Sequence, residues 1–447
     1  MRGRAVPTTV DIPASLYRKL EAQAAAQGRS VRDLILSCLR FNHAKDRHAR
    51  SASVKFPMIV SKGPKVSLTN EQIYEHVEFP RFRFCRAATS NWRSWRIVIV
   101  KAFLFSVPLL SLFHAPANAQ YWKVQTSGID TNLRAVSVAN TPGEKGVSVL
   151  VVWACGSNGV ILKSVDEGKT WQRLHVEGGE TLDFRGVVAF NATTAYLMSS
   201  GEGEKSRIYK TTDGGETWSL QGSDNRKEFF LDSIACISEK ECIALGDPIN
   251  GKFLLLKTSN GEHWNPLTTD NMPPALGGEG AFAASNSCIV LKGNEIYFGT
   301  GGPAARVFHS SDGGLTWTVV RTPIVQGNAS SGIFALAFDG ENRLIVIGGD
   351  YKQPDYSERV AAYSADNGKT WQLAAKQPSG FRSAVAYLDS GIWVAAGPSG
   401  EDISTDGGVH WKHTDSLNLN AWFILDGQGG WGVGAKGTIA RFVNHFR

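Results

Sequence analysis

The chain has 447 residues, of which 42% are hydrophobic and 20% charged, with 47 Gly and 13 Trp. This composition excludes a disordered chain, a collagen and a polytopic membrane protein, and it favours many short strands joined by tight turns. Residues 1–119 carry 19 Lys and Arg against 7 Asp and Glu, whereas residues 120–447 carry 28 against 34. A basic front part and an acidic remainder indicate two units with different partners or surroundings.

Residues 1–80 predict a small α+β unit. Residues 8–13 read as a short strand, and residues 14–27 as a helix with apolar residues at i, i+4 and i+8. A second helix begins at the capping sequence 30–33. The pattern resembles the ribbon-helix-helix antitoxin family over residues 5–80. This resemblance implies a dimer, with DNA or a toxin as the partner of this segment.

Residues 81–119 read as a linker followed by a secretory leader. A basic start at Arg93, Arg96 and Lys101 precedes an apolar run over 102–113. Residues 117–119 (Ala-Asn-Ala) then give the small-residue pattern of a cleavage site. The apolar run is shorter than the roughly 20 residues that span a bilayer. We therefore expect export and cleavage after Ala119.

The mature protein is then expected to be residues 120–447, in the periplasm or outside the cell. An alternative is an uncleaved membrane anchor that also uses residues 97–100. The 92 residues before the leader indicate either a gene fusion or a reading frame that has been started too early, and we favour the early start. A cytoplasmic DNA-binding unit and an exported unit would not share a compartment, which supports that interpretation.

One motif of eight residues, with Ser or Thr first, Asp third, Gly fifth and Trp last, recurs through the rest of the chain. Its four full copies, which also have Thr before the Trp, contain Asp166 and Trp171, Asp213 and Trp218, Asp312 and Trp317, and Asp366 and Trp371. A fifth copy, with Asp406 and Trp411, has His in place of that Thr. A sixth copy at 257–264 is degenerate and has lost the Asp. A recurrence every 40–55 residues or so, with strand-like flanks, predicts a β-propeller.

The motif has a mechanical interpretation. Its Asp accepts hydrogen bonds from turn N–H groups, its Gly allows a positive φ, and its Trp begins the next strand with the ring packed between blades. The motif resembles the Asp-box, or BNR repeat, of sialidases and related propellers. In that family the box joins the third and fourth strands of a blade and is structural, so we expect none of these aspartates to be catalytic.

The number of blades follows from the segments that begin them. The expected first strands contain residues 133–136, 184–187, 231–234, 282–285, 333–336, 381–384 and 422–425. The last blade has no Asp-box and ends one strand short, and residues 121–125 read as the missing strand. Pairing these segments would close the ring and remove its open edge. We therefore predict an all-β, seven-bladed propeller over 120–447.

The cysteines fit an exported protein. Cys236 and Cys242 bracket a five-residue turn and predict a disulfide, the alternative being two unpaired thiols in a cytosolic chain. Cys155 and Cys288 fall in separate blades and read as small buried residues. The sequence contains no Cys-x-x-Cys motif or histidine cluster, so we expect neither a metal nor a cofactor.

Three arginines suggest a binding site at the channel. Arg134, Arg185 and Arg382 occupy equivalent places at the start of three first strands. Facing the channel, they would form a cationic patch that suits carboxylates, phosphates or an acidic peptide end. The alternative is that each arginine pairs with a local carboxylate and only holds the blades together. Asp232, at the matching place in the third blade, is a candidate for such a partner.

Further polar residues lie in glycine-rich or irregular loops. These candidates are Asp247, Glu279, Arg306, Asp350 and Tyr351. Polar groups beside glycine indicate either a ligand site or ordinary turn chemistry. Because several such residues occur together, the sequence supports a ligand site as strongly as it supports ordinary turn chemistry.

The whole stretch 120–447 resembles the photosystem II stability/assembly factor-like branch of Asp-box propellers. The resemblance rests on the leading Trp122 and on the Leu-Arg-x-Val segment at 133–136. It implies an exported, non-catalytic propeller that binds a protein partner, itself exported or membrane-associated, through the arginine patch. The photosystem need not be the partner, because relatives outside photosynthesis share the fold.

The alternative function is a sialidase-like glycoside hydrolase acting on acidic sugars. Arg134, Arg185, Arg382, Tyr351 and Glu279 could fill the roles that this chemistry requires. However, the Arg-Ile-Pro segment that precedes the first box in sialidases is absent, and sialidases have six blades. We therefore assign no catalytic residue.

Overall fold

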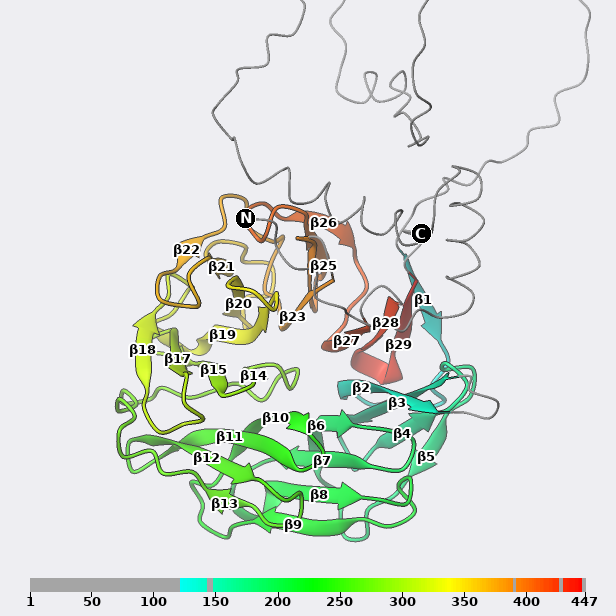
Figure 1. The fold of residues 1–447 in the computed structure, drawn as a ribbon. Coiled ribbons are helices and arrows are strands. Elements are labelled where there is room, and N and C mark those ends of the chain that lie inside the picture. The colour runs from blue at the N-terminus through cyan, green and yellow to red at the C-terminus, as the bar shows by residue number, and fades with distance from the viewer. Residues whose placement is uncertain (1–120, 143–147, 389–390, 426–428, 444–447) are drawn as a thin grey trace, which may run out of the picture. The chain divides into compact units, whose positions relative to one another are not determined.

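The computed structural model describes residues 121–142, 148–388, 391–425 and 429–443. The expected ribbon-helix-helix segment, the linker and the leader lie outside these residues. The described residues form seven antiparallel sheets arranged around a ring, so the prediction of a seven-bladed, all-β propeller is confirmed (Figure 1). Apart from strands they contain two short 3₁₀ turns, Gly203–Lys205 and Ala435–Gly437, and no helix in them could cross a membrane.

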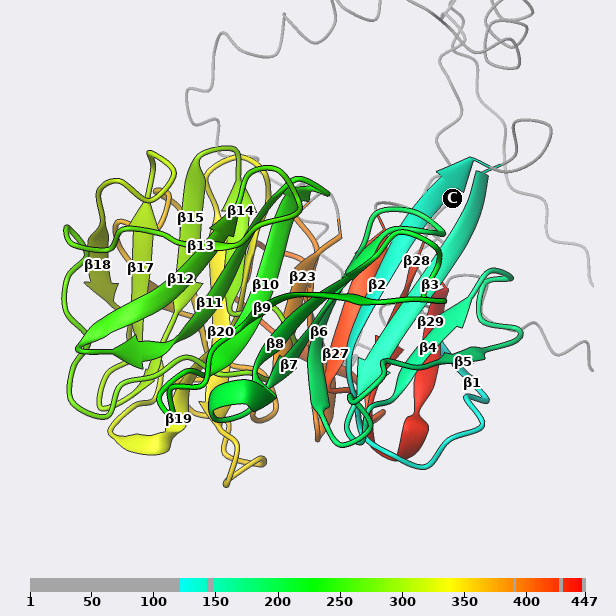
Figure 2. The same ribbon diagram turned by 90° about the horizontal axis from the view of Figure 1, so that it is seen from below.

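Each blade is a meander whose first strand lies nearest the centre of the ring, and Figure 2 shows the blades from the side. Blade 1 consists of β2 (Leu133–Pro142), β3 (Ser148–Gly156), β4 (Ile161–Ser164) and β5 (Gln172–Leu174). Blade 2 consists of β6 (Asp183–Ala189), β7 (Ala195–Ser200), β8 (Arg207–Thr211) and β9 (Ser219–Ser223). Blade 3 consists of β10 (Leu231–Ser238), β11 (Glu241–Ile249), β12 (Lys252–Thr258) and β13 (Asn265–Pro266). Blade 4 consists of β14 (Ile289–Lys292), β15 (Glu295–Gly299), β17 (Arg306–Ser310) and β18 (Thr318–Arg321). Blade 5 consists of β19 (Asn328–Phe338), β20 (Leu344–Asp350), β21 (Ala361–Ser364) and β22 (Gln372–Leu373). Blade 6 consists of β23 (Ala384–Tyr387), β24 (Trp393–Gly397), β25 (Gly400–Ser404) and β26 (Lys412–Asp415). Blade 7 consists of β27 (Ala421–Leu425), β28 (Gly429–Val433), β29 (Ile439–Val443) and β1 (Tyr121–Gln125), and the short β16 (Gly301–Gly302) pairs with β19.

The ring is closed by the two ends of the propeller. Strand β1 pairs antiparallel with β29, and Trp122 lies opposite Phe442. The Trp122 ring stacks on Trp422 with 5.9 Å between centroids, and its Nε1 donates a hydrogen bond of 2.6 Å to Glu401 of blade 6. The predicted closing strand is therefore confirmed, and it leaves blade 7 with four strands.

The expected first strand of blade 4 is wrong. Residues 282–285 lie outside any strand, and the first strand of this blade is β14 at Ile289–Lys292. The Phe282 ring stacks on Phe334 of blade 5 with 3.9 Å between centroids, and the carbonyl of Ala283 accepts a hydrogen bond from Arg185 of blade 2. Contacts with other blades therefore hold this segment at the channel, and it does not pair with β15.

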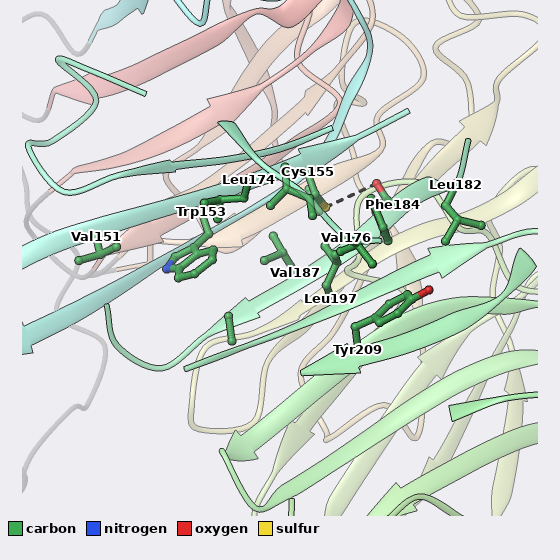
Figure 3. Packing of buried hydrophobic residues seen from close by; sticks show 13 residues of the cluster. Val151, Trp153, Cys155, Leu174, Val176, Leu182, Phe184, Val187, Leu197 and Tyr209 are labelled. Carbon is green, nitrogen blue, oxygen red and sulfur yellow. Dashed lines mark hydrogen bonds between the residues drawn. The ribbon is translucent and has the colours of Figure 1, made fainter. Parts of the chain in front are cut away.

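The core is divided among the seven interfaces between adjacent blades. One cluster of buried apolar side chains lies at each interface, and Figure 3 shows the cluster between blades 1 and 2, which includes Trp153, Phe184 and Tyr209. The tryptophan of each of the six boxes belongs to or packs against the cluster shared with the preceding blade. Blade 7 has no box, and Trp122 takes this place between blades 6 and 7.

The Asp-boxes join the third and fourth strands of their blades. In the first box the Asp166 carboxylate accepts hydrogen bonds from the Thr170 N–H at 2.9 Å and the Thr170 hydroxyl at 2.7 Å. These bonds hold the pKa of Asp166 down, to about 2. In the degenerate box, Asn260 accepts hydrogen bonds from the N–H groups of Glu262 and His263, so an amide replaces the missing carboxylate in a shortened turn.

Candidate functional site

The inner strands of four blades carry a β-bulge at the same point. The pairing register of each strand skips one residue there, and the skipped residues are Arg134, Arg185, Asp232 and Phe334. A bulge bends the strand and re-aims the side chain of the extra residue. All four residues line one cavity of about 500 Å³, to which all seven blades contribute, and we call it the channel cavity.

Arg134 and Arg185, the arginine pair, form the basic side of the channel cavity. Arg185 makes an ion pair of 2.7 Å with Asp183, and Arg134 Nε lies 3.6 Å from the other oxygen of the same carboxylate. Burial and the neighbouring Arg185 lower the pKa of Arg134. Local pairing, the alternative interpretation of these arginines, therefore holds only in part. Two guanidinium groups share one carboxylate, and both side chains are about one-quarter exposed.

Asp232 and Asp247, the carboxyl pair, form the acidic side. Asp232 is 1% exposed, and no described residue donates a hydrogen bond to either of its oxygens. Burial and the nearby Asp247 raise the pKa of Asp232 well above its usual range. Asp247 accepts a hydrogen bond of 3.1 Å from the Ala281 N–H, and burial raises its pKa to about 6.

The bulge that presents Asp247 depends on a glycine. The register of β11 against β12 skips Asp247, between Gly246 and Pro248. A Cβ at Gly246 would lie 2.3 Å from the carbonyl oxygen of Phe230, so no other residue fits there without moving the backbone. The close approach of β11 to Phe230, the residue before β10, therefore requires a glycine at the position before Asp247.

An aromatic wall made by Phe282, Phe334, Phe381 and Tyr351 completes the channel cavity. Phe334 stacks on Phe282 and meets Phe381 edge-on at 4.7 Å between centroids. Tyr351 contacts Phe334 edge-on at 6.1 Å and remains 49% exposed. The three phenylalanines were not among the predicted site residues. The sequence does hold a signal for Phe334, because it follows Ile333 in its inner strand as Arg134 follows Leu133.

A second cavity of about 620 Å³, the adjoining cavity, continues from the first. The two share Phe230, Asp247, Ala281 and Phe282 in their linings. Glu279 lies here with a fully buried side chain, whose oxygens accept hydrogen bonds from Arg306, the Thr300 hydroxyl and the Leu276 N–H. Glu279 and Arg306 therefore fix the glycine-rich loop 277–280, which lines the adjoining cavity.

Besides Arg306, two predicted site residues line neither cavity. Arg382 is fully buried and donates to Asp402, the Phe381 carbonyl and the Ser399 hydroxyl, so its guanidinium is committed to structure. Asp350 is also buried and accepts hydrogen bonds from the Lys352 N–H and from Gln353, which is turn chemistry. The structure thus gathers Arg134, Arg185, Asp232, Asp247 and Tyr351 in the channel cavity.

The cysteines pair as the turn suggests. Cys236 and Cys242 lie opposite each other on β10 and β11 and are joined by a disulfide. Cys155 and Cys288 are free and buried, and burial raises the pKa of both thiols. Among the residues that the structure describes, no group of three or more His, Cys, Asp and Glu side chains is placed to bind a metal.

Comparison with known families decides the nature of the repeat. The model of the BNR/Asp-box repeat matches residues 209–220 and 362–373. The chain carries Asp-box repeats. No curated protein matches it, and the comparisons give no support to a ribbon-helix-helix segment at residues 5–80.

Solved structures share the propeller fold at low sequence identity. YCF48 bound to D1 peptide is 16% identical with a TM-score of 0.52, and the match covers 72% of this chain and 97% of that one. YCF48 from Cyanidioschyzon merolae is 16% identical with a TM-score of 0.46, covering 72% and 98%. An ancestral GH74 enzyme is 15% identical with a TM-score of 0.50, covering 73% and 48%. The likenesses to YCF48 bound to D1 peptide and to the GH74 enzyme establish the fold alone.

Proposed function

We propose that this protein is an exported, non-catalytic propeller that holds an extended segment of a protein partner in the channel cavity and acts as an assembly or stability factor. The observation that carries the proposal is the arginine pair, which shares a single carboxylate and stands beside an aromatic wall.

The chemistry of the channel cavity suits a peptide. Guanidinium groups bind carboxylates with directed, charge-assisted hydrogen bonds, so the arginine pair can hold an acidic side chain or a carboxyl terminus. The aromatic wall offers a large apolar surface to neighbouring side chains. The adjoining cavity extends the site past Asp247, which gives room for several residues of an extended chain. The neighbour YCF48, with its bound D1 peptide, is a propeller of similar fold that holds a peptide.

Export is proposed on two further observations. Residues 93–119 have the basic start, apolar run and small-residue end of a secretory leader. The disulfide between Cys236 and Cys242 is suited to an oxidising compartment. The expected partner is therefore itself exported or attached to a membrane.

The test is capture followed by affinity measurement. Full-length protein is immobilised, exposed to solubilised envelope proteins of the source organism, and the retained proteins are identified by mass spectrometry. Peptides tiled across a retained protein then give a dissociation constant. We expect the Arg134→Ala/Arg185→Ala variant to weaken binding by about tenfold or more, since a charge-assisted pair contributes about 1.5–3 kcal/mol. The control Arg226→Ala, which removes an exposed arginine paired with Asp224, should bind like the wild type. Equal binding by the double variant would contradict the proposal.

A glycoside hydrolase acting on acidic sugars is the second candidate. One observation favours it: the carboxyl pair has raised pKa values in a cavity that also holds arginines. Of the residues that the sialidase resemblance would use, Glu279 and Arg382 lie outside the channel cavity. Sugar release from a panel of sialylated and uronic-acid glycans, lost in Asp247→Asn, would establish this activity. No release from any of them would leave only the binding function.

A further inference from the structure

We infer that the carboxyl pair, Asp232 and Asp247, is a subsite for a positively charged lysine or arginine side chain of the bound protein segment. This inference rests on the proposed function, because it names which chemistry the partner segment presents beside the arginine pair.

The first support is the way the backbone presents the two carboxylates. Asp232 is the bulged residue of β10 and Asp247 that of β11, so two neighbouring strands of blade 3 each turn one carboxyl group out of the ladder. Both line the channel cavity, and Asp247 also lines the adjoining cavity. Asp247 is only partly buried, whereas Asp232 is 1% exposed. A ligand would therefore touch Asp247, with the carboxyl group of Asp232 beneath it.

The second support is that the protein leaves Asp232 without a donor. Neither oxygen of its carboxyl group accepts a hydrogen bond from any described residue. The cation whose charge acts on it is Arg185, and that guanidinium is already held by Asp183 at 2.7 Å and by the Ala283 carbonyl at 2.5 Å. A buried carboxylate is costly unless a cation or a set of donors compensates it. A ligand ammonium or guanidinium group would supply that compensation.

The third support is the apolar surface beside the carboxyl pair. Phe230 and Phe282 line both cavities together with Asp247. The methylene stem of a lysine or arginine packs well on aromatic rings while its charged end reaches a carboxylate, and the ring faces themselves attract a cation. An uncharged polar ligand would gain neither contribution. The site is thus suited to a long basic side chain.

The consequence is a fixed register for the partner segment. The arginine pair takes an acidic group from blades 1 and 2, and the carboxyl pair takes a basic group from blade 3, within one cavity of about 500 Å³. A segment with two like charges at this spacing would place one of them against a group of the same sign, which is unfavourable. Recognition would therefore require one basic and one acidic residue a few positions apart.

The experiment uses amino-acetylated hexapeptide pools presented to the immobilised full-length chain. In each pool one position is fixed as Lys, Arg, norleucine or Glu and the others are randomised; norleucine matches the lysine stem without the charge. The protein variants are Asp232→Asn, Asp247→Asn and their combination, with Asp130→Asn as the matched control, since Asp130 is exposed between β1 and β2. Thermal unfolding of every variant verifies that the propeller is folded.

At one fixed position we expect Lys and Arg pools to be retained at least about tenfold more than the norleucine pool, as for a charge pair shielded from solvent. The combined Asn variant should reduce this ratio to about one, while Asp130→Asn keeps it. The inference is overturned, and the proposed function stands, if retention of the pools falls in the Arg134→Ala/Arg185→Ala variant but basic residues are not preferred. The same conclusion follows if retention falls in that variant but the preference for basic residues survives in the combined Asn variant. If no pool is retained, both are overturned.

Discussion

Replacing Arg382 by alanine should destabilise the propeller strongly. The Arg382 and Asp402 side chains are 0% and 1% exposed, and the guanidinium also donates to Ser379, Ser399 and the Phe381 carbonyl. Its removal leaves the Asp402 carboxylate buried with His413 Nδ1, 4.0 Å away, as the remaining basic group within ion-pair distance among the described residues. Removing one partner of a buried ion pair costs about 3–5 kcal/mol. We expect the free energy of unfolding to fall by that amount, because the hydrogen bonds that remain on Asp402 come from the N–H and the hydroxyl of Ser379 at 3.1–3.2 Å.

Urea denaturation of the full-length chain, followed by tryptophan fluorescence, measures this loss. Arg226→Ala is the matched control: Arg226 pairs with Asp224 at 2.7 Å, but its side chain is 51% exposed. An exposed pair of this kind contributes at most about 1 kcal/mol. The variant Arg382→Met/Asp402→Leu removes both charges and keeps the volume, and it should recover most of the stability. A loss for Arg382→Ala no larger than for Arg226→Ala would refute the reasoning.

Three further predictions concern the closure, the boxes and the bulge. Trp122→Ala should cost about 3–5 kcal/mol and speed hydrogen exchange in blade 7, because it opens the contact between blades 6 and 7. Hydrogen bonds from the box threonines lower the pKa of Asp166 and Asp312 to about 2. These carboxylates therefore stabilise the fold fully above about pH 4, and this stabilisation is lost as the pH falls towards 2. Urea titrations across this pH range should show a shallower decline for Asp166→Asn. Gly246→Ala should lower the thermal midpoint and weaken peptide binding, because its Cβ would meet the Phe230 carbonyl.

The candidate site was only partly predictable. The residues at the start of the inner strands recur at the period of the repeat, so Arg134, Arg185 and Asp232 could be assigned to equivalent places. The same reasoning placed Arg382 with them, but its side chain is held by Asp402. Sequence position identifies the backbone site, whereas the direction of a long side chain depends on which carboxylate the fold brings near it.

The fold, in contrast, was determined by local signals in the sequence itself. Each Asp-box is a self-contained turn whose hydrogen bonds join residues two to four positions apart, and its tryptophan marks the interface with the preceding blade. The spacing of the boxes gave the blades, and the leading Trp122 strand gave the closure. Tertiary structure alone decided the rest: the placing of Phe282 at the channel, the sharing of Asp183 by two arginines and the isolation of Asp232. These depend on contacts between blades, such as that between Arg185 and Ala283, which lie 98 positions apart, and no local pattern encodes such contacts.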